Sequence, residues 1–524
     1  MRRLVVGTLL ALIPRVAVCS TPTPWVEARS AHFVVLCDAG EKDARRLAMQ
    51  FERMRLVFQT IFQAASESED ASDVGAPITV IAVRDRREMQ ALEPAAYAEK
   101  GHTDLSGMFL RSAEENTILV RLDAPEEHAF STVYHEYTHY MLRRADAWMP
   151  LWLNEGLAQF YENTEIGEKQ VLLGEANAEQ LRYLKLNPLL PVATLFTVGT
   201  QSPYYHDEQK ASIFYAESWA LAHYLLAVDR ASGTHRVHDY TERLSQSEDP
   251  VTAARHAFGD LDALQSALSA YIAQRSLPYF TLPAAIPSQD AILRVRAVSI
   301  AEADAAQARA AICTGRMEEA RALLDAALRE DPGYAPAHET MGLLRYREGD
   351  LPGACKWYGE AMRLDPLSYT AQYDFAEMSL RAGSRGEDEV IESSLRTSIG
   401  LNPQFAPAYD ALAMFYSSRH RSLDDAYALS LRAIELQPDS LSYRVDCAEL
   451  LAQRKQFAGA IGELGAAMRL AKTAAEIAAI ETRTSWVESN QAAQAGPGGG
   501  RRAVPVSSET VRGPDPGGEP QEMR

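Results

Sequence analysis

Residues 131–160 read STVYHEYTHYMLRRADAWMPLWLNEGLAQF, and this stretch decides how the first half of the chain folds. The motif His135-Glu136-Tyr137-Thr138-His139 lies in a run that is compatible with a helix. Its two histidines are four residues apart, which places both imidazoles on one helical face, where they can share a metal ion. Glu136 is positioned to accept a proton from an attacking water. Pro150 ends this helix, and a second helix with Glu155 in its first turn begins directly after it.

Strand and helix signals alternate upstream of this helix pair. Short apolar runs rich in β-branched residues predict strands, and runs with helical hydrophobic spacing predict helices. The predicted strands are 32–37, 78–83, 107–110 and 117–122, and the predicted helices are 44–62, 86–98 and one that begins near residue 126. We therefore expect an α+β domain with a mixed sheet over residues 21–290.

Downstream of residue 300 the sequence predicts only helices, and it repeats. Pro332, Pro366, Pro403 and Pro438 close successive units, at separations of 34, 37 and 35 residues. Small residues recur where the two helices of a unit would pack closely. This pattern resembles the tetratricopeptide repeat, in which helix pairs stack into a solenoid. The resemblance implies an all-α solenoid over residues 300–475 that binds a protein partner and folds as a unit of its own. Unrelated helical hairpins are the alternative.

Both ends of the chain differ in composition from the rest. A basic start, Met1-Arg2-Arg3, and the apolar run 4–14 resemble a secretory signal peptide over residues 1–20, which predicts a secreted or periplasmic protein. A buried N-terminal strand is the alternative. Glycine- and proline-rich runs cannot build a core, so residues 488–524 are predicted to form a disordered tail. No later apolar run has transmembrane length, so we expect no transmembrane segment in the mature chain.

Composition narrows the classes of function. The chain has 524 residues with 52 Lys or Arg and 71 Asp or Glu, which gives a net charge of −19. A hydrophobic content of 47% excludes a wholly disordered or fibrous chain. The acidic balance argues against nucleic acid as a partner, because phosphate binding requires concentrated Lys and Arg. The 5 cysteines are too few and too scattered for a disulfide framework.

The helix pair resembles that of the gluzincin zinc metallopeptidases, especially their aminopeptidase-N-like branch. That family carries His-Glu-x-x-His followed by a helix that reads Trp-Leu-Asn-Glu-Gly, and this chain has that sequence at residues 152–156. The resemblance implies that His135, His139 and Glu155 bind one zinc ion per chain and that Glu136 is the general base. The loop between the helices is a few residues shorter than in the aminopeptidases.

The same resemblance implies an oxyanion donor on a later helix. The family places a tyrosine there at a characteristic distance from the carboxylate ligand, and Tyr215 lies 60 residues after Glu155. Tyr215 is therefore the predicted second catalytic residue, because its hydroxyl can donate a hydrogen bond to developing negative charge.

The chain departs from the aminopeptidases before the first helix. They carry Gly-x-Met-Glu-Asn on an edge strand, and its glutamate binds the free amine of the substrate, whereas residues 106–110 here read Ser-Gly-Met-Phe-Leu. The strand can still pair with an extended peptide through main-chain hydrogen bonds. The chain is more similar to the smaller peptidase-MA-like gluzincins, some of which are fused to tetratricopeptide repeats, and a typical aminopeptidase is not expected.

These expectations describe a zinc metallopeptidase that hydrolyses a peptide or protein substrate and recruits a protein through its repeats. Two alternatives stay open. In one, the peptidase-like half is an inactive scaffold that binds peptides or proteins; the presence of Glu136 argues against it, because a pure binder needs no base beside the metal. In the other, the zinc site hydrolyses another amide, in cell-wall peptide.

Overall fold

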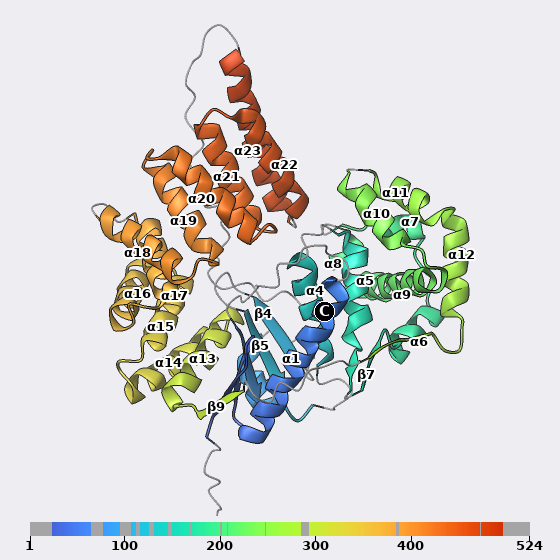
Figure 1. Ribbon diagram of the computed structural model, residues 1–524, viewed down its shortest axis with the longest axis horizontal. Coiled ribbons are helices and arrows are strands. Elements are labelled where there is room, and N and C mark those ends of the chain that lie inside the picture. Colours follow the sequence, from blue (N-terminus) through green and yellow to red (C-terminus); the bar gives the residue numbers. More distant parts are fainter. Residues whose placement is uncertain are drawn as a thin grey trace, which may run out of the picture.

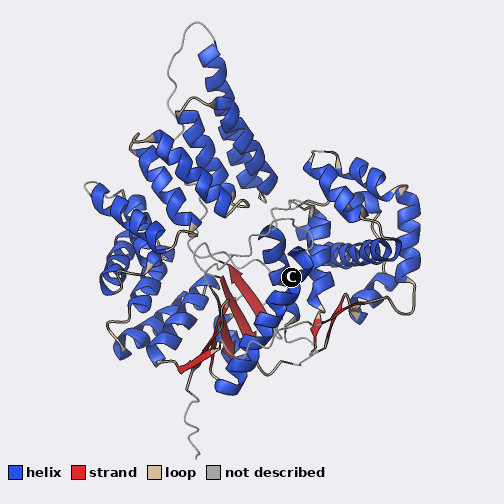
Figure 2. Cartoon of the chain, viewed as in Figure 1, coloured by secondary structure: helices blue, strands red, loops and turns tan. Residues whose placement is uncertain are grey.

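The protein consists of an α+β domain followed by a curved solenoid of helix pairs (Figure 1). The computed structural model describes residues 24–63, 77–94, 106–111, 116–124, 130–144, 149–167, 169–199, 202–206, 208–246, 248–283, 293–383, 387–471 and 473–495. All strands in these ranges lie in the α+β domain (Figure 2). None of the helices in these ranges has the length and hydropathy needed to cross a membrane. The predicted signal peptide lies outside the described residues.

A mixed sheet organises the α+β domain, as predicted, and in the described residues it has six strands. Its order is β4-β5-β3-β2-β1-β9. The central strands β2, β3 and β5 are parallel, whereas β1, β4 and β9 pair antiparallel with their neighbours. The strand bounds are β1 Val26–Arg29, β2 Phe33–Cys37, β3 Ile78–Val83, β4 Gly107–Arg111, β5 Asn116–Arg121 and β9 Arg294–Ala297.

Strands β1 and β9 of this sheet were not predicted. The edge strand β9 lies between the predicted end of the domain at residue 290 and the predicted start of the repeats at residue 300. It pairs with β1 over its whole length. The last strand of the sheet is therefore delivered by the segment that leads directly into the solenoid.

Three helices of the α+β domain, α1, α2 and α4, each follow a strand of the sheet, and α5 to α12 come later in the sequence. Their bounds are α1 Glu41–Gln63, α2 Arg86–Leu92, α4 Ser131–Arg144, α5 Leu151–Glu162, α6 Ala178–Leu186, α7 Val192–Leu195, α8 Pro203–His206, α9 Glu208–Ser232, α10 Arg236–Ser245, α11 Pro250–Phe258 and α12 Leu261–Ile272. A small second sheet contains β6 Glu165–Ile166, β7 Gln170–Leu173 and β8 Phe280–Pro283. The helix expected to start near residue 126 begins at Ser131, and α2 ends earlier than expected, at Leu92.

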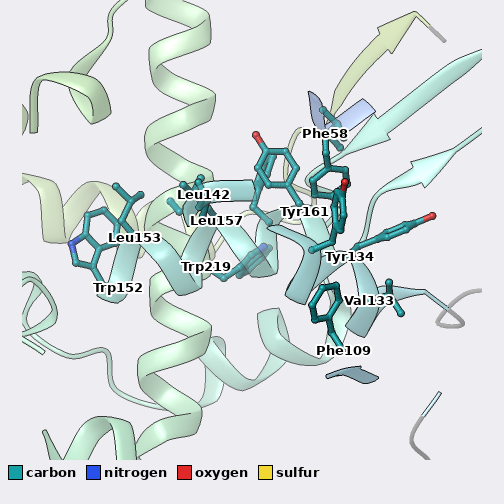
Figure 3. Close-up of a cluster of buried hydrophobic side chains, with 14 of the residues drawn as sticks. Phe58, Phe109, Val133, Tyr134, Leu142, Trp152, Leu153, Leu157, Tyr161 and Trp219 are labelled. Carbon is teal, nitrogen blue, oxygen red and sulfur yellow. The ribbon is translucent and has the colours of Figure 1, made fainter. Parts of the chain in front are cut away.

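One face of the sheet packs against α1 and α4 through large side chains. Phe33 of β2 contacts Phe51 of α1, and Phe58 of the same helix packs between Tyr134 of α4 and Tyr161 of α5. Figure 3 shows the last three aromatic rings side by side. Burial of aromatic side chains is a large stabilising term, so this cluster fixes where α4 and α5 lie on the sheet.

The opposite face of the sheet packs against the solenoid. Side chains alternate between the two faces of a strand, and on β4 Phe109 joins the α1 side whereas Met108 and Leu110 join the other. On that second side they share one hydrophobic cluster with Ala305 and Ala308 of α13. Figure 1 shows α1 and α13 on opposite sides of the sheet. The sheet thus lies between α1 and α4 on one side and α13, the first helix of the solenoid, on the other.

The solenoid contains the predicted helix pairs. Their bounds are α13 Ile300–Cys313, α14 Met317–Glu330, α15 Ala335–Arg347, α16 Leu351–Leu364, α17 Tyr369–Arg381, α18 Asp388–Leu401, α19 Ala406–Ser418, α20 Leu423–Leu436, α21 Leu441–Gln453 and α22 Phe457–Leu470. Small residues allow close packing within a pair: a side chain at Gly342 would approach the ring of Tyr358 to 2.9 Å. A further helix, α23 Ala474–Ala495, continues beyond the predicted end of the repeats and eight residues into the predicted tail. Residues 496–524 lie outside the described part.

Candidate functional site

Helix α4 is anchored by its tyrosines, which leaves its histidines on another face. The hydroxyl of Tyr134 accepts a hydrogen bond of 2.6 Å from Gln50 Nε2 of α1, and Tyr137 packs edge-on against Phe58. Both tyrosines are buried in the core that faces the sheet. Because residues four apart share a helical face, this anchoring places His135 and His139 together, with their ring centroids 4.8 Å apart.

Helix α5 packs against α4 on the same face of the sheet and is held there by α9. Pro150 caps its start, and the Pro150 carbonyl accepts hydrogen bonds from the amides of Leu153 and Asn154. At Gly156 an added Cβ would lie 2.4 Å from the carbonyl oxygen of Ser218 on α9, so only glycine permits this crossing. The crossing fixes the neighbouring residue, Glu155, opposite the histidines.

Three donor atoms from the two helices converge on one point. His135 Nε2 and His139 Nε2 are 3.1 Å apart, and Glu155 Oε2 lies 3.7 Å and 3.6 Å from them, respectively. Four ligands around a tetrahedral ion with bonds of about 2.1 Å must lie about 3.4 Å from one another. The set therefore fits one tetrahedral ion with a fourth position open. A carboxylate oxygen of Glu136 lies within 4.8 Å of the histidine nitrogens, and the side chains of Glu136, His139 and Glu155 are buried.

The second nitrogen of each histidine is held by a residue of α5 that the sequence analysis did not single out. His139 Nδ1 contacts Asn154 Oδ1 at 2.5 Å, and His135 Nδ1 lies 3.4 Å from Glu162 Oε2. Such partners fix the tautomer and orientation of a metal-binding imidazole. The sequence does contain a signal for Glu162. This residue follows Glu155 by seven positions, or about two helical turns, so both carboxylates lie on one face of α5.

The carboxylates around His135 also set its charge. Burial lowers the pKa of this imidazole, but the hydrogen bond to Glu162 and the charges of Glu136, Glu162 and Glu155 outweigh it and raise the pKa to about 9. The site is therefore electrostatically suited to a cation, whether a proton or a metal ion.

Tyr215, the remaining predicted site residue, comes from a third helix, α9. It is half-buried, and its ring lies 6.1 Å from that of Tyr205 on α8 and 5.4 Å from that of Phe214. It precedes Ser218, the residue that meets Gly156, by one helical turn. The structure thus joins His135, Glu136, His139 and Glu155 in one cluster and places Tyr215 one turn from the crossing of α5 and α9.

Comparison with known proteins finds a family model that matches this region and solved structures that resemble part of the chain. Residues 129–248 match the family DUF1570, described as a protein of unknown function; this segment is less than a quarter of the chain and contains every predicted site residue. No curated protein matches the chain.

Several solved structures resemble a little more than a third of the chain. Pseudomonas aeruginosa pilF has a TM-score of 0.32 and 16% identity, covering 37% of this chain and 86% of its own. A thermophilic TPR protein of Thermus thermophilus has a TM-score of 0.30 and 19% identity, covering 36% and 98%. YrrB, described as a TPR protein with an unusual peptide-binding site, has a TM-score of 0.29 and 16% identity, covering 35% and 92%. At these scores the likenesses say nothing about the function of this chain.

Proposed function

We propose that the α+β domain is a zinc-dependent peptide-bond hydrolase of the gluzincin type and that the solenoid recruits a protein to it. The observation that carries this proposal is the donor set of His135 Nε2, His139 Nε2 and Glu155 Oε2, whose separations of 3.1 to 3.7 Å suit one tetrahedral zinc ion. Two histidines and a carboxylate with an open fourth position are typical of catalytic zinc, whereas structural zinc sites are closed. Export of the protein stays a prediction.

Glu136 would act as the general base. Its carboxylate is buried beside the histidines but is not needed to complete the donor set. From there it can accept a proton from the attacking water and return that proton to the leaving amine. When bound, a zinc ion supplies Lewis acidity that activates water and polarises the carbonyl oxygen. Asn154 and Glu162 hold the imidazoles in place, and the phenol of Tyr215 would donate a hydrogen bond to the oxyanion.

Strand β4 would bind the substrate. It is one of the two edges of the six-stranded sheet, and among the described residues it pairs with β5 alone. An extended peptide can add to such an edge through main-chain hydrogen bonds. Phe109 occupies the place at which the aminopeptidases carry the amine-binding glutamate, and its ring packs 6.1 Å from Tyr140 of α4. With a phenyl ring at this place, we expect cleavage at internal peptide bonds rather than removal of N-terminal residues.

The proposal is tested by metal analysis of the purified full-length protein together with cleavage of an unbiased peptide library. We expect about one zinc per chain and cleavage of internal bonds. Glu136→Gln should keep the zinc and lose at least about 10²-fold in turnover, because it removes the proton acceptor without removing a ligand. Stoichiometric zinc without cleavage of any peptide would favour the scaffold, cleavage of cell-wall fragments alone would favour the amidase, and full activity of Glu136→Gln would refute the mechanism.

A further inference from the structure

Helix α9 carries a buried carboxyl whose only hydrogen-bond partner among the described residues is one backbone amide. Glu217 is 0% exposed, and its Oε2 accepts a hydrogen bond of 2.7 Å from the amide of Leu190. Its other oxygen, Oε1, is also buried and accepts no hydrogen bond from these residues. A negative charge at this place would lose its hydration and gain only one donor in return. The geometry therefore favours the neutral carboxylic acid.

No cation in the described part of the chain offsets the cost of that charge. The helices that pack closely against α9 are α5, α6, α8, α10 and α12, and α5, α8 and α12 contain no lysine or arginine. The basic residues of the other two are exposed or paired elsewhere: Arg182 and Lys185 on α6, and Arg236 and Arg243 on α10. The acidic residues of these helices are Glu155, Glu162, Glu179, Asp239, Glu242 and Asp262. Burial raises the pKa of Glu217 to about 8 against the hydrogen bond from Leu190, and no described side chain of these helices contributes to the shift.

The partner of Glu217 belongs to the short connection between α6 and α7. Residues 187–191 read Asn-Pro-Leu-Leu-Pro, and the two prolines have no amide hydrogen to donate. The amide of Leu190 donates to Glu217 of α9, and the next amide in the chain, that of Val192, donates to Gln265 Oε1 of α12 at 2.7 Å. Side chains of two helices thus fix the start of α7.

Glu217 lies on the same turn of α9 as two residues of the candidate site. Successive residues of a helix are rotated by about 100°, so Glu217 lies about 200° around the axis from Tyr215, on nearly the opposite face. Ser218, whose carbonyl oxygen meets Gly156 of α5, follows Glu217 directly. The bond to Leu190 therefore holds the back of the turn that presents Tyr215 and crosses α5. A shift or rotation of α9 at Glu217 would displace both features.

We propose that Glu217 is a positioning residue for the candidate site and that it acts as a neutral carboxylic acid. In this form it ties α9 to the start of α7 and keeps Tyr215 and the crossing with α5 in place. When the carboxyl releases its proton in alkaline solution, the buried charge regains water only if α9 or the segment before α7 moves outward. The tie therefore loosens as the pH rises. The effect on Tyr215 rests on the proposed function, whereas the tie and its pH dependence do not.

Glu217→Gln tests the protonation state, because its amide oxygen can still accept the Leu190 hydrogen bond but the side chain cannot ionise. The folded protein holds the proton of Glu217 up to about pH 8, whereas the unfolded chain releases it at the ordinary value near 4.5, so the unchanged protein loses stability across this window. The midpoint of urea unfolding of the variant, relative to that of the unchanged full-length protein, should rise from about pH 5 to about pH 8 and then level off. A difference that does not depend on pH would overturn the proposal.

Hydrogen exchange locates the movement. The amides of residues 187–196 should exchange faster in the unchanged protein than in Glu217→Gln, and the ratio of the two rates should grow by up to about tenfold per pH unit, the limit for an opening that releases one proton. Base catalysis of exchange cancels because both proteins are compared at the same pH. Glu242→Gln, exposed on α10, should match the unchanged protein throughout. If Glu217→Gln does not fold, residues 187–196 are compared with α1 within the unchanged protein, and an equal pH dependence of the two segments would refute the tie.

The pH profile of peptide cleavage tests the positioning role. At about pH 9, one unit above the pKa of Glu217, the kcat of the unchanged protein should be about tenfold lower than expected from the profile of Glu217→Gln, with little change in KM. A parallel decline in both proteins would show that the ionisation does not reach Tyr215 and would contradict the positioning role. If neither protein cleaves peptides at any pH, the proposed function fails, while the urea midpoints and the exchange rates still decide whether Glu217 forms a pH-dependent tie.

Discussion

The two helical layers that cover the sheet differ in what they bury. On the side of the candidate site, buried polar groups are common: Glu136 and His139 on α4, Glu155 on α5, and Glu217 on α9, whose pKa is raised to about 8 by burial. On the solenoid side, the cluster shared with the sheet is apolar and rich in alanine, for example Ala305, Ala308 and Ala311.

This difference follows from what each layer has to do. A buried polar group costs free energy unless a defined partner satisfies it, so the site helices need partners such as Asn154 and Glu162 at fixed places. An alanine side chain has no polar group that requires a partner, and its small size lets α13 lie close to the sheet. The site side is therefore specified mainly by individual hydrogen bonds. The solenoid side is specified mainly by size and shape, apart from the hydrogen bonds of Arg316 to α2. Substitutions in the two layers should then have separable effects.

The largest effect is expected from His139→Ala. Loss of a residue that hydrogen-bonds a metal ligand typically lowers metal affinity by about 10- to 100-fold. Removing one of the three proposed ligands should lower zinc affinity by more than that, and the protein should lose all activity. The apolar junction with the solenoid does not involve His139, so the helical circular dichroism should be unchanged. The measurement is the zinc content of the variant by mass spectrometry. Stoichiometric zinc in this variant would show that His139 is not a zinc ligand.

Tyr215→Phe is expected to have the next largest effect. It deletes the hydroxyl of the proposed oxyanion donor without a change of shape, so kcat should fall by about 10² to 10³ while KM changes little. Zinc content and thermal stability should match those of the unchanged protein. Tyr205→Phe is the control, because its ring packs 6.1 Å from that of Tyr215. If Tyr205→Phe loses activity and Tyr215→Phe retains it, the oxyanion donor is assigned to the wrong residue.

Glu162→Gln should act on the metal through His135. The carboxylate lies 3.4 Å from His135 Nδ1, and loss of such a partner typically costs about 10- to 100-fold in metal affinity. The zinc dissociation constant, measured by competition with a chelator, should rise accordingly, and Glu242→Gln on the exposed face of α10 should leave it unchanged. An unaltered dissociation constant in Glu162→Gln would mean that the imidazole is oriented by other contacts.

The site was more predictable from sequence than the arrangement around it. Helical spacing brings His135 and His139 together on one face, and this geometry holds wherever α4 packs. By contrast, the need for glycine at Gly156 depends on Ser218, which lies 62 residues later in the chain. No periodicity within one helix encodes a crossing between two helices.

The junction between the two regions was the least predictable part. Strand β9 reads Arg-Val-Arg-Ala and lacks the apolar run by which β2, β3, β4 and β5 were predicted, because as an edge strand it is mostly exposed. The alanines of α13 fit a repeat helix that stacks on its neighbour, and sequence alone does not show that they also cover β4 and β5. The predicted independence of the repeats is therefore expected for the later pairs, whose clusters contain only solenoid residues, rather than for α13.

The smallest effect, and the sharpest separation of the two layers, is expected from Arg316→Ala. Arg316 follows α13, and its guanidinium donates hydrogen bonds to the carbonyl oxygens of Gln90 and Glu93 at the end of α2, at 2.7 and 2.8 Å. Burial raises the pKa of the Glu93 carboxyl, and the charges of Arg316, Arg86 and Arg121 oppose that shift. The substitution therefore also removes the strongest of the three charges that stabilise this buried carboxylate.

We expect Arg316→Ala to lower the free energy of unfolding by about 1–3 kcal/mol, the usual cost of losing hydrogen bonds from a charged donor, with no change in zinc content or KM. The midpoint of urea unfolding is the measurement. Arg316→Lys should recover only part of the loss, because an ammonium retains the charge but lacks the planar fork that reaches both carbonyls. Arg363→Ala, which breaks an exposed pair with Glu360, should change the midpoint little. If Arg316→Ala released the zinc, the two layers would be coupled through the sheet, and the independence inferred from their different interiors would be wrong.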